Sequence, residues 1–518
     1  VRWKAAFHPG AYTSVMNVAS ISVSRQGGYP YRSLSTGQIA HDDTCYYRRN
    51  AFTDGLTIGW TGKRVLVTSV TSFQYIDDDM TLDQDFLPRP YFTLTQRRHE
   101  YAFTEDLYAS GTRGSLRWLG GVFAFFKDMN MHAPVTFKDD GITNLIEKHP
   151  NDLNPTYPIR WNERSFVLGS EFDVITKGIA LYQQSSKHFG RWDVELGLRL
   201  DIERSQLHYR SNCDTGYTTY HLLPDGSMEV YSHNPVKIDQ TGDLSRTFVQ
   251  FLPKIAVGYT AGPSTKLYAN IAKGYKSGGY NTQMFSDVLQ QKIMGMMGLT
   301  EKYDVDDIVS YLPEKSWNFE VGADVACCCN TSLNAAIFYI LCTDQQLTTF
   351  PDGLTTGRIM TNAGRTRSLG MELSVTSTPV DRLTLRGSYG FTDARFLRYH
   401  NGKENLKGKF LPYAPRNTVF LSADYAFPVS FVGFVPSVNV SGRGVGKIFW
   451  DDANTVSQPF YSTLSASAAV DNGKLAIRLW GENITSTRYA TFYFVSMGNA
   501  FVQQANPLIF GVTLRFVL

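Results

Sequence analysis

The segment 192–204, WDVELGLRLDIER, alternates apolar and mostly charged side chains over nearly its whole length. Its apolar members are Val194, Leu196, Leu198, Leu200 and Ile202, and between them stand Asp193, Glu195, Gly197, Arg199, Asp201 and Glu203. A period of two places successive side chains on opposite faces of a β-strand. One face of this strand is therefore apolar and the other charged, which is typical of a strand with lipid outside and a wet lumen inside.

Other segments divide in the same way. TKLYANIA, from residue 265, carries its apolar side chains at odd positions, and LAIRLWGE, from residue 475, places Arg478 and Glu482 opposite its leucines. Short reversals between such segments are expected near His8-Pro9-Gly10, Gly62-Lys63, Gly190, Gly262-Pro263, Asn330, Pro379 with Asp381, Pro428 and Asn472-Gly473. Asn-Gly and similar pairs suit two-residue reversals. The pattern predicts hairpins joined by longer connections.

Those longer connections are polar. We expect them at about residues 27–53, 80–94, 128–165, 210–246, 280–314, 348–362, 397–416, 449–458 and 495–506, with a short helix at 288–297 inside one of them. The strands between them number about 19. The alternation of short turns and long loops predicts an all-β fold: a large antiparallel transmembrane β-barrel with tight periplasmic turns and long extracellular loops.

Composition supports this class. Aromatic residues make up 14% of the 518 residues, and charged residues only 19%, against roughly a quarter in an ordinary soluble domain. No run of about 18 apolar residues occurs, so no transmembrane helix is expected. The start, VRWKAAFHPG, has no basic segment followed by an apolar one, so we expect no signal peptide. The net charge of +3 argues against a nucleic-acid partner.

Three motifs resemble one family. YANIAKGYKSGGYN from residue 268, NAGRTRSLGMELSVTSTP from residue 362, and GENITSTRYA followed by the terminal FGVTLRFVL are similar to the middle, late and closing hairpins of TonB-dependent outer-membrane receptors. Gly370 and Glu372 occupy the Gly-x-Glu of that family, and Leu518 replaces its usual terminal aromatic residue. The resemblance covers nearly the whole chain. It implies a barrel of the 22-stranded type in the outer membrane of a Gram-negative bacterium.

The front of the chain departs from that family. Its members begin with an energy-coupling box and a globular plug, and neither is visible before VRWKAAFHP. An antiparallel barrel with an odd number of strands cannot close, and unpaired backbone groups in lipid are costly. We therefore expect residues 1–518 to be a barrel domain that lacks the signal peptide, the TonB box, the plug and the first strands. Those parts are either removed or carried by another polypeptide.

The loops offer aromatic and basic side chains for a ligand. The candidates are Tyr29, Tyr31, Tyr46, Tyr47, Arg48, Arg49, Phe86, Arg89, Tyr91, Phe92, Tyr280 and Met284. An anionic aromatic ligand, such as a catecholate or hydroxamate chelate of iron, would suit ring stacking and cationic contacts. The alternative is an interfacial girdle, because Tyr and Trp favour the headgroup level of any membrane barrel.

A second set of residues is expected to line the lumen and contact a plug. It contains Arg199, Asp201, Glu203, Lys276, Arg367, Arg386, Arg478 and Glu482. Pairs such as Arg199 and Glu203 could act as acid and base, but inward positions on strands favour the lumen wall. No HExxH, GxSxG or P-loop pattern occurs, so no enzyme activity, catalytic residue or cofactor is expected.

No metal site is expected either. Cys327, Cys328 and Cys329 are consecutive at a turn and poorly arranged for one metal. A disulfide between Cys45 and Cys213 stays open, since spacing does not support it. The acidic cluster Asp77, Asp78, Asp79, Asp83 and Asp85 has the oxygen density of a calcium site. It lacks the spacing of a calcium loop, which favours a solvated turn at the barrel rim.

The resemblance implies a receptor that imports a scarce ligand, a ferric siderophore first among the candidates. The alternatives are a cobalamin, haem or glycan receptor of the same family, or a passive porin. The implied partners are the TonB–ExbB–ExbD complex acting through the absent plug, the ligand, outer-membrane lipid and lipopolysaccharide. A surface lipoprotein or a separate plug chain is a further candidate.

Overall fold

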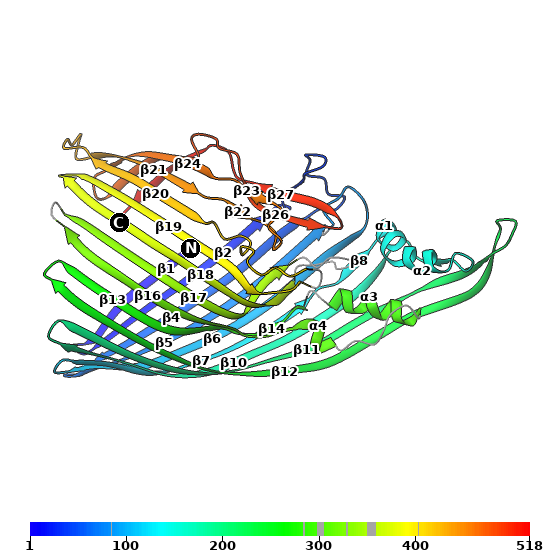
Figure 1. The fold of residues 1–518 in the computed structure, drawn as a ribbon, viewed down its shortest axis with the longest axis horizontal. Helices are drawn as coiled ribbons and strands as arrows, with labels where there is room; N and C mark the ends of the chain where they lie inside the picture. The colour runs from blue at the N-terminus through cyan, green and yellow to red at the C-terminus, as the bar shows by residue number, and fades with distance from the viewer. Residues whose placement is uncertain are drawn as a thin grey trace.

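The computed structural model describes residues 1–83, 85–282, 285–297, 305–327, 330–349, 359–401 and 404–517. Its main feature is a 21-stranded antiparallel sheet (Figure 1). Two of these strands, β8 and β9, are short side branches, and the other 19 follow one another around a barrel wall. They are β1 (Arg2–Gly10), β2 (Thr13–Gln26), β4 (Tyr46–Thr61), β5 (Val65–Asp83), β6 (Phe92–Arg113), β7 (Leu116–His132), β10 (Phe166–Phe189), β11 (Trp192–Leu222), β12 (Met228–Gly262), β13 (Thr265–Lys276), β16 (Glu314–Cys327), β17 (Thr331–Thr349), β18 (Ile359–Val380), β19 (Leu383–Arg398), β20 (Asn417–Ala426), β21 (Val435–Val445), β24 (Tyr461–Asp471), β25 (Leu475–Glu482) and β28 (Ile509–Phe516). The expected fold class and strand number are confirmed.

One end of the barrel carries the short reversals. Most lie where the sequence predicts them, and Gly190 and Gly473 have the positive φ angles, 62° and 84°, that glycine adopts without strain. The first reversal differs, because β1 continues to Gly10 and the chain turns only at residues 11 and 12. Pro379 likewise stays within β18, and the turn follows at Asp381 and Arg382.

The opposite end carries the long connections, and several of them are shorter than predicted. The largest error is the loop expected at 210–246, where β11 and β12 instead remain paired as far as Leu222 and Met228. The two strands project beyond the wall as a long hairpin, drawn at the right of Figure 1. The polar composition of this region concealed the strands, but several of its apolar side chains are buried, including Cys213, Val236 and Ile238.

The acidic cluster also lies elsewhere than the sequence analysis predicted. Asp77, Asp78, Asp79 and Asp83 belong to β5 rather than to a rim turn, and Asp78 is 6% exposed. Asp83 and Asp85 are fully buried. The expectation of a solvated turn is therefore wrong, because long loops from elsewhere in the chain cover these carboxylates.

The long connections contain short elements that pack together. They are β3 (Tyr31–Ser33), β8 (Val135–Phe137), α1 (Asp139–Gly141), the π-helix η1 (Ile142–Glu147), α2 (Lys148–Leu153), β9 (Ile159–Trp161), β14 (Gly279–Tyr280), α3 (Phe285–Met296), α4 (Val305–Val309), β15 (Ser310–Tyr311), β22 (Ile448–Phe449), β23 (Ser457–Gln458), β26 (Ala490–Ser496) and β27 (Asn499–Gln504). The helix predicted at 288–297 corresponds to α3.

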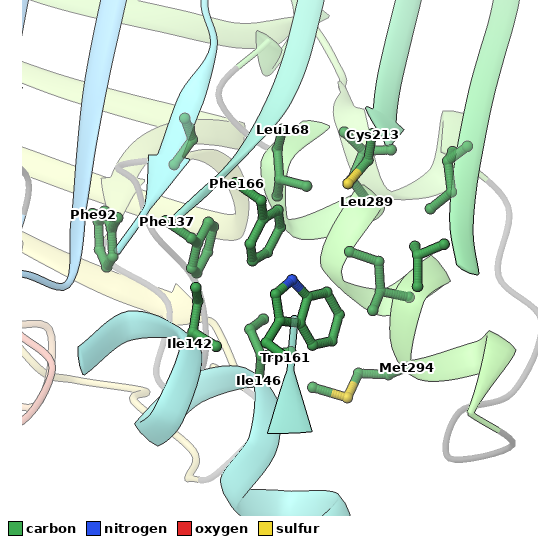
Figure 2. Packing of buried hydrophobic residues seen from close by; sticks show 14 of the residues in the cluster. Phe92, Phe137, Ile142, Ile146, Trp161, Phe166, Leu168, Cys213, Leu289 and Met294 are labelled. Atoms are coloured by element: carbon green, nitrogen blue, oxygen red, sulfur yellow. The ribbon is translucent and has the colours of Figure 1, made fainter. Parts of the chain in front are cut away.

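Figure 2 shows the largest buried cluster of this end, here called the loop core. Phe137 stacks on Phe166 with ring centres 5.4 Å apart, and Trp161 lies tilted against Phe166 at 5.1 Å. Leu289 and Met294 of α3 close the cluster. Burial of large aromatic rings contributes much of the stability of such a cluster. The connections at this end therefore form a packed cap on the wall.

The faces of the wall follow the predicted alternation. On β11, Leu196 and Leu198 are 52% and 49% exposed, whereas Asp201 is 8% exposed. On β28, Phe510 and Leu514 are 82% and 69% exposed. The outward face is thus apolar, and the inward face carries the charged side chains.

The wall has two free edges within the described residues. The outer strand β1 pairs only with β2, and the last strand β28 pairs only with β25. No register joins β1 to β28 in this part of the chain. The open N–H and C=O groups of both edges can accept further strands.

Candidate ligand-binding site

Three long connections meet in an aromatic cluster at the cap. Strands β26, β27 and β3 form a three-stranded sheet, which brings residues 31–33 beside residues 490–504. The cluster comprises Tyr29, Tyr31, Phe86, Phe492, Phe494 and Phe501. Phe86 meets Tyr31 and Phe494 edge to face, with ring centres 5.1 Å and 5.2 Å apart, a favourable geometry for aromatic pairs.

The predicted ligand residues Tyr29, Tyr31 and Phe86 are therefore brought together by the fold. Tyr29 and Tyr31 are half-buried, and burial raises the pKa of Tyr29 to about 12. Phe86 is only 6% exposed. Its ligand contact remains a prediction, and its burial favours a packing role.

Tyr46, Tyr47, Arg48 and Arg49 lie on β4 rather than in a loop, and alternation splits them between two faces. Arg48 lies over the ring of Tyr46 at 4.5 Å, and Arg49 lies over that of Tyr47 at 5.5 Å. Arg49 also donates two hydrogen bonds to Asp78, at 2.6 Å and 2.8 Å. The charge of Arg49 is thus already paired within the wall.

The candidates after β5 are mostly engaged in packing. Arg89 is exposed and forms an ion pair with Asp140 at 2.7 Å. The backbone carbonyl of Tyr91 accepts a hydrogen bond from the N–H of Lys138. Phe92 is 2% exposed and belongs to the loop core. Among these three residues, Arg89 offers the most accessible surface.

The remaining loop candidates lie near α3. Tyr280 is half-buried, and its ring packs against a cluster that contains Phe285 of α3. Its hydroxyl group lies 3.5 Å from the carbonyl oxygen of Ser205. Met284 falls outside the described residues.

The inward face of β11 carries the predicted lumen residues Arg199, Asp201 and Glu203. Arg199 donates two hydrogen bonds of 2.8 Å to Asp201 and lies 5.6 Å from the ring centres of Phe123 and Tyr182. Glu203 accepts a hydrogen bond of 2.7 Å from Ser277. These charges are held by neighbouring wall residues, so the wall presents a fixed polar surface.

Most of the other lumen candidates lie on the inward face of the wall. Arg478 and Glu482 lie on the face away from the exposed Leu479, and Arg386 lies on the face away from the exposed Leu385. Lys276 shares its face with Tyr268, away from the exposed Leu267. Arg386 forms an ion pair of 2.5 Å with Asp424.

Arg367 is the exception, since it shares its face with Leu369, Met371 and Leu373, which are about equally exposed at 40% to 42%. Its placement in the lumen is therefore corrected. It lies on the outward face, where it contacts Asp393 at 3.3 Å.

Sequence reasoning missed a basic aromatic patch, which comprises Arg395, Phe410, Arg416, Lys447 and Phe449. Phe410 and Phe449 stack with ring centres 5.5 Å apart. Arg395 and Arg416 lie over Phe410 at 4.0 Å and 4.8 Å, and Lys447 lies over Phe449 at 4.4 Å. The only sequence signal was the proximity of basic and aromatic residues at the end of one strand and within two connections. This patch combines ring surface with cationic charge.

The cysteines form no disulfide in the part of the chain that is described. Cys45, Cys213 and Cys342 are free and buried, and Cys327 is free and exposed. The pairing of Cys45 with Cys213, which the sequence left open, is therefore absent. Cys328 and Cys329 lie outside the described residues.

Fold and wall together define a large antiparallel β-barrel with a charged inner face and a packed cap of loops. Residues 4–484 match the family model described as "TonB dependent receptor-like, beta-barrel". The chain therefore belongs to the family of TonB-dependent receptor β-barrels, as the motifs of the sequence indicated.

The relatives that match this chain in sequence are receptors. The chain is 26% identical over 418 residues to the pesticin receptor of Yersinia enterocolitica serotype O:8, a match covering 73% of this chain and 56% of that protein. It is 33% identical over 119 residues to the ferrioxamine receptor of Yersinia enterocolitica, which covers 23% of this chain and 16% of that protein. This chain thus spans little more than half the length of the pesticin receptor.

Solved structures share the fold. The ferric yersiniabactin uptake receptor FyuA of Yersinia pestis superposes with a TM-score of 0.72 and 18% identity over 99% of this chain and 70% of that one. The siderophore receptor PiuA of Acinetobacter baumannii gives a TM-score of 0.68 with 14% identity over 99% and 73% of the two chains. None of the described helices combines the length and apolarity needed to cross a bilayer.

Proposed function

We propose that this chain is the barrel of an outer-membrane receptor that imports a ferric siderophore. The observation that carries the proposal is the family match over residues 4–484, joined to a wall with an apolar outward face and a charged inward face. Relatives named for pesticin and ferrioxamine, and neighbours that take up ferric chelates, support a siderophore over cobalamin, haem or a glycan.

In this proposal the apolar outward face contacts the lipid of the outer membrane of a Gram-negative bacterium. The short reversals then face the periplasm, and the cap faces the outside, where ligands arrive. Lipopolysaccharide surrounds the cap in the outer leaflet.

The working receptor contains a plug and further strands, supplied by other parts of the polypeptide or by a separate chain. Two features support this. The edges of β1 and β28 are open to additional pairing among the described residues, and an unpaired edge in lipid is costly. The ion-paired inward face around Arg199 and Asp201 offers a polar surface for a plug.

Energy for transport would come from the TonB–ExbB–ExbD complex pulling on a coupling segment attached to that plug. The ligand itself undergoes no covalent change. No catalytic role is proposed for any wall residue, because the ion pairs described here hold the wall together.

The ligand of this proposal is anionic and partly aromatic, as ferric catecholates and phenolate chelates are. The half-buried phenols of Tyr29 and Tyr31 supply hydrogen-bond donors and ring faces, and the exposed guanidinium group of Arg89 supplies cationic charge. Stacking and cation–π contacts to such a ligand contribute about 0.5–2 kcal/mol each.

Uptake measurements test the proposal. A strain lacking the gene is supplied with single ⁵⁵Fe-labelled chelates, with and without the complete gene restored, and in the presence or absence of TonB. We expect restored, TonB-dependent uptake of one chelate class. The variant Arg89→Gln should raise the half-saturating chelate concentration, whereas Lys63→Gln in a short turn should not.

Other outcomes decide between alternatives. Unchanged iron uptake from every chelate, with TonB-dependent uptake of cobalamin, haem or a glycan, would replace the siderophore by that ligand. Uptake of small solutes that does not require TonB would identify a passive porin.

A further inference from the structure

Three aspartates from two separate parts of the chain converge near the aromatic cluster. Asp42 lies in the connection between β3 and β4, Asp83 is the last residue of β5, and Asp85 follows it closely. One carboxylate oxygen from each lies within 4.8 Å of those of the other two. Asp83 and Asp85 have no exposed surface, and Asp42 is exposed on one side. This group is called the acidic pocket below.

The acidic pocket lacks compensating charge. Lys138 lies 3.3 Å from Asp42 but also 2.5 Å from Asp43, so one cation serves two carboxylates. The Nδ1 atom of His41 lies 3.6 Å from Asp83. Among the described residues, four carboxylates thus face one lysine and one histidine. Buried carboxylates need a counter-charge or a proton.

The hydrogen bonds of the pocket leave one oxygen open. Asp85 accepts backbone N–H groups from Leu87 at 2.9 Å and Phe92 at 3.4 Å. The Oδ2 atom of Asp83 accepts the backbone N–H of Asp42 at 3.0 Å. The Oδ1 atom of Asp83 is buried and has no hydrogen-bond partner among the described residues. An unpaired buried oxygen calls for a partner, such as a bound cation or a proton.

The donor set selects the kind of ligand. The three side chains offer only carboxylate oxygens, which hard cations prefer. The nearby thiol of Cys45 is already used, because its sulfur accepts the N–H of Asp83 at 3.2 Å and donates to the carbonyl of Asp43 at 3.7 Å. The Nε2 atom of His41 contacts the carbonyl oxygen of Tyr29 at 3.1 Å. Calcium fits this set better than zinc or copper, which favour nitrogen and sulfur.

We propose that Asp42, Asp83 and Asp85 form a calcium site that fastens the connection before β4 to the end of β5. The site adjoins the candidate ligand surface through Phe86, which follows Asp85. Phe86 has a φ angle of 58°, an uncommon conformation for a residue with a large side chain. Its ring contacts Tyr31 and His41 at 5.1 Å and 6.1 Å. A bound cation would hold the strained backbone in place and orient this part of the aromatic cluster.

The site does not depend on the proposed transport activity, and it is tested on the purified complete receptor in detergent. After removal of metals with EDTA, calcium, magnesium and zinc are titrated separately by calorimetry, and the melting temperature is measured with each metal. We expect one calcium ion to bind with a dissociation constant of about 10⁻⁴ to 10⁻³ M, as in extracellular calcium modules. Calcium should raise the melting temperature, and magnesium should bind more weakly.

Two variants and one control separate the explanations. Asp42→Asn lies at the exposed side of the pocket and should fold normally while weakening calcium binding about tenfold, a loss of about 1.4 kcal/mol. Asp85→Asn should abolish the calcium-dependent rise in melting temperature. Asp152→Asn, at an exposed aspartate of α2 paired with Lys148, should change neither measurement.

Three results would overturn the proposal. The first is no calcium binding by the folded wild-type chain, and the second is equal binding by wild type and Asp42→Asn. The third is an Asp85→Asn variant that is as stable without calcium as wild type is with it, because an amide imitates a protonated carboxyl group. That result would show that Asp83 and Asp85 share a proton instead.

Discussion

Replacing Ile271 with arginine tests whether the outward face of the wall contacts lipid. Ile271 lies at the middle of β13 and is 43% exposed. It stands opposite Ile255 on β12 and Phe319 on β16, which are themselves 51% and 38% exposed. If the outward face meets hydrocarbon, all three side chains lie in it.

The preceding residue provides a matched control on the same strand. Asn270 points to the opposite face and stands opposite Glu320 on β16. An arginine at 270 therefore enters the lumen beside a carboxylate. An arginine at the bilayer midplane costs about 2–4 kcal/mol on the lipid face of a barrel. A surface substitution away from packing features usually stays within about 0.5 kcal/mol.

The assay is reversible unfolding of the complete receptor in phospholipid vesicles by guanidinium chloride, followed by tryptophan fluorescence and by the gel mobility of unheated samples. We expect Ile271→Arg to lower the free energy of unfolding by about 2–4 kcal/mol and Asn270→Arg to leave it nearly unchanged. Ile271→Ala separates the loss of apolar area from the insertion of charge. Equal losses for both arginine variants would refute the assignment of faces, and no loss for either would refute lipid contact.

Three further predictions concern the wall and the cap. Arg199→Leu should lower the free energy of unfolding by about 3 kcal/mol, because it leaves the buried carboxylate of Asp201 unpaired. Adding Asp201→Leu to this variant should recover most of the loss, as measured by a double-mutant cycle. Phe501→Ala should speed hydrogen exchange in β3, β26 and β27, since its fully buried ring contacts two other rings, whereas Phe510→Ala should not. Burial raises the pKa of Glu147, although the hydrogen bond from the N–H of Trp161 opposes this effect. The contribution of this carboxyl group to stability is therefore complete below its unfolded pKa of about 4.3, and it is lost as the pH rises through the folded pKa. Glu147→Gln should accordingly gain in melting temperature over wild type between about pH 4 and pH 7, and a constant difference would contradict the assignment.

The strand order and the positions of most reversals were predictable because they depend on short stretches of chain. Alternation around Leu198 and Arg199 assigns faces with no knowledge of neighbouring strands. The reversals at Gly190 and Gly473 depend on the conformational freedom of one residue. The same local reasoning found α3 and counted 19 consecutive strands.

The errors lie where contacts come from distant parts of the chain. Arg367 was assigned to the lumen as an inward position on a strand, but the wall places it on the outward face, which it shares with Leu369. The hairpin of β11 and β12 was mistaken for a loop because its buried face is covered by α3 and by residues from other connections. Polar composition cannot reveal a strand whose apolar partners lie elsewhere.

The sequence by itself determined the class of fold, the alternation of faces and the family, because each of these is written in periodicity or in short motifs. The tertiary structure alone decided which side chains of the cap meet. Tyr31 reaches Phe494, and Asp42 reaches Asp83, only after the strands between them have paired around the wall. Loop contacts of this kind depend on closure over long stretches of chain, so no local pattern records them.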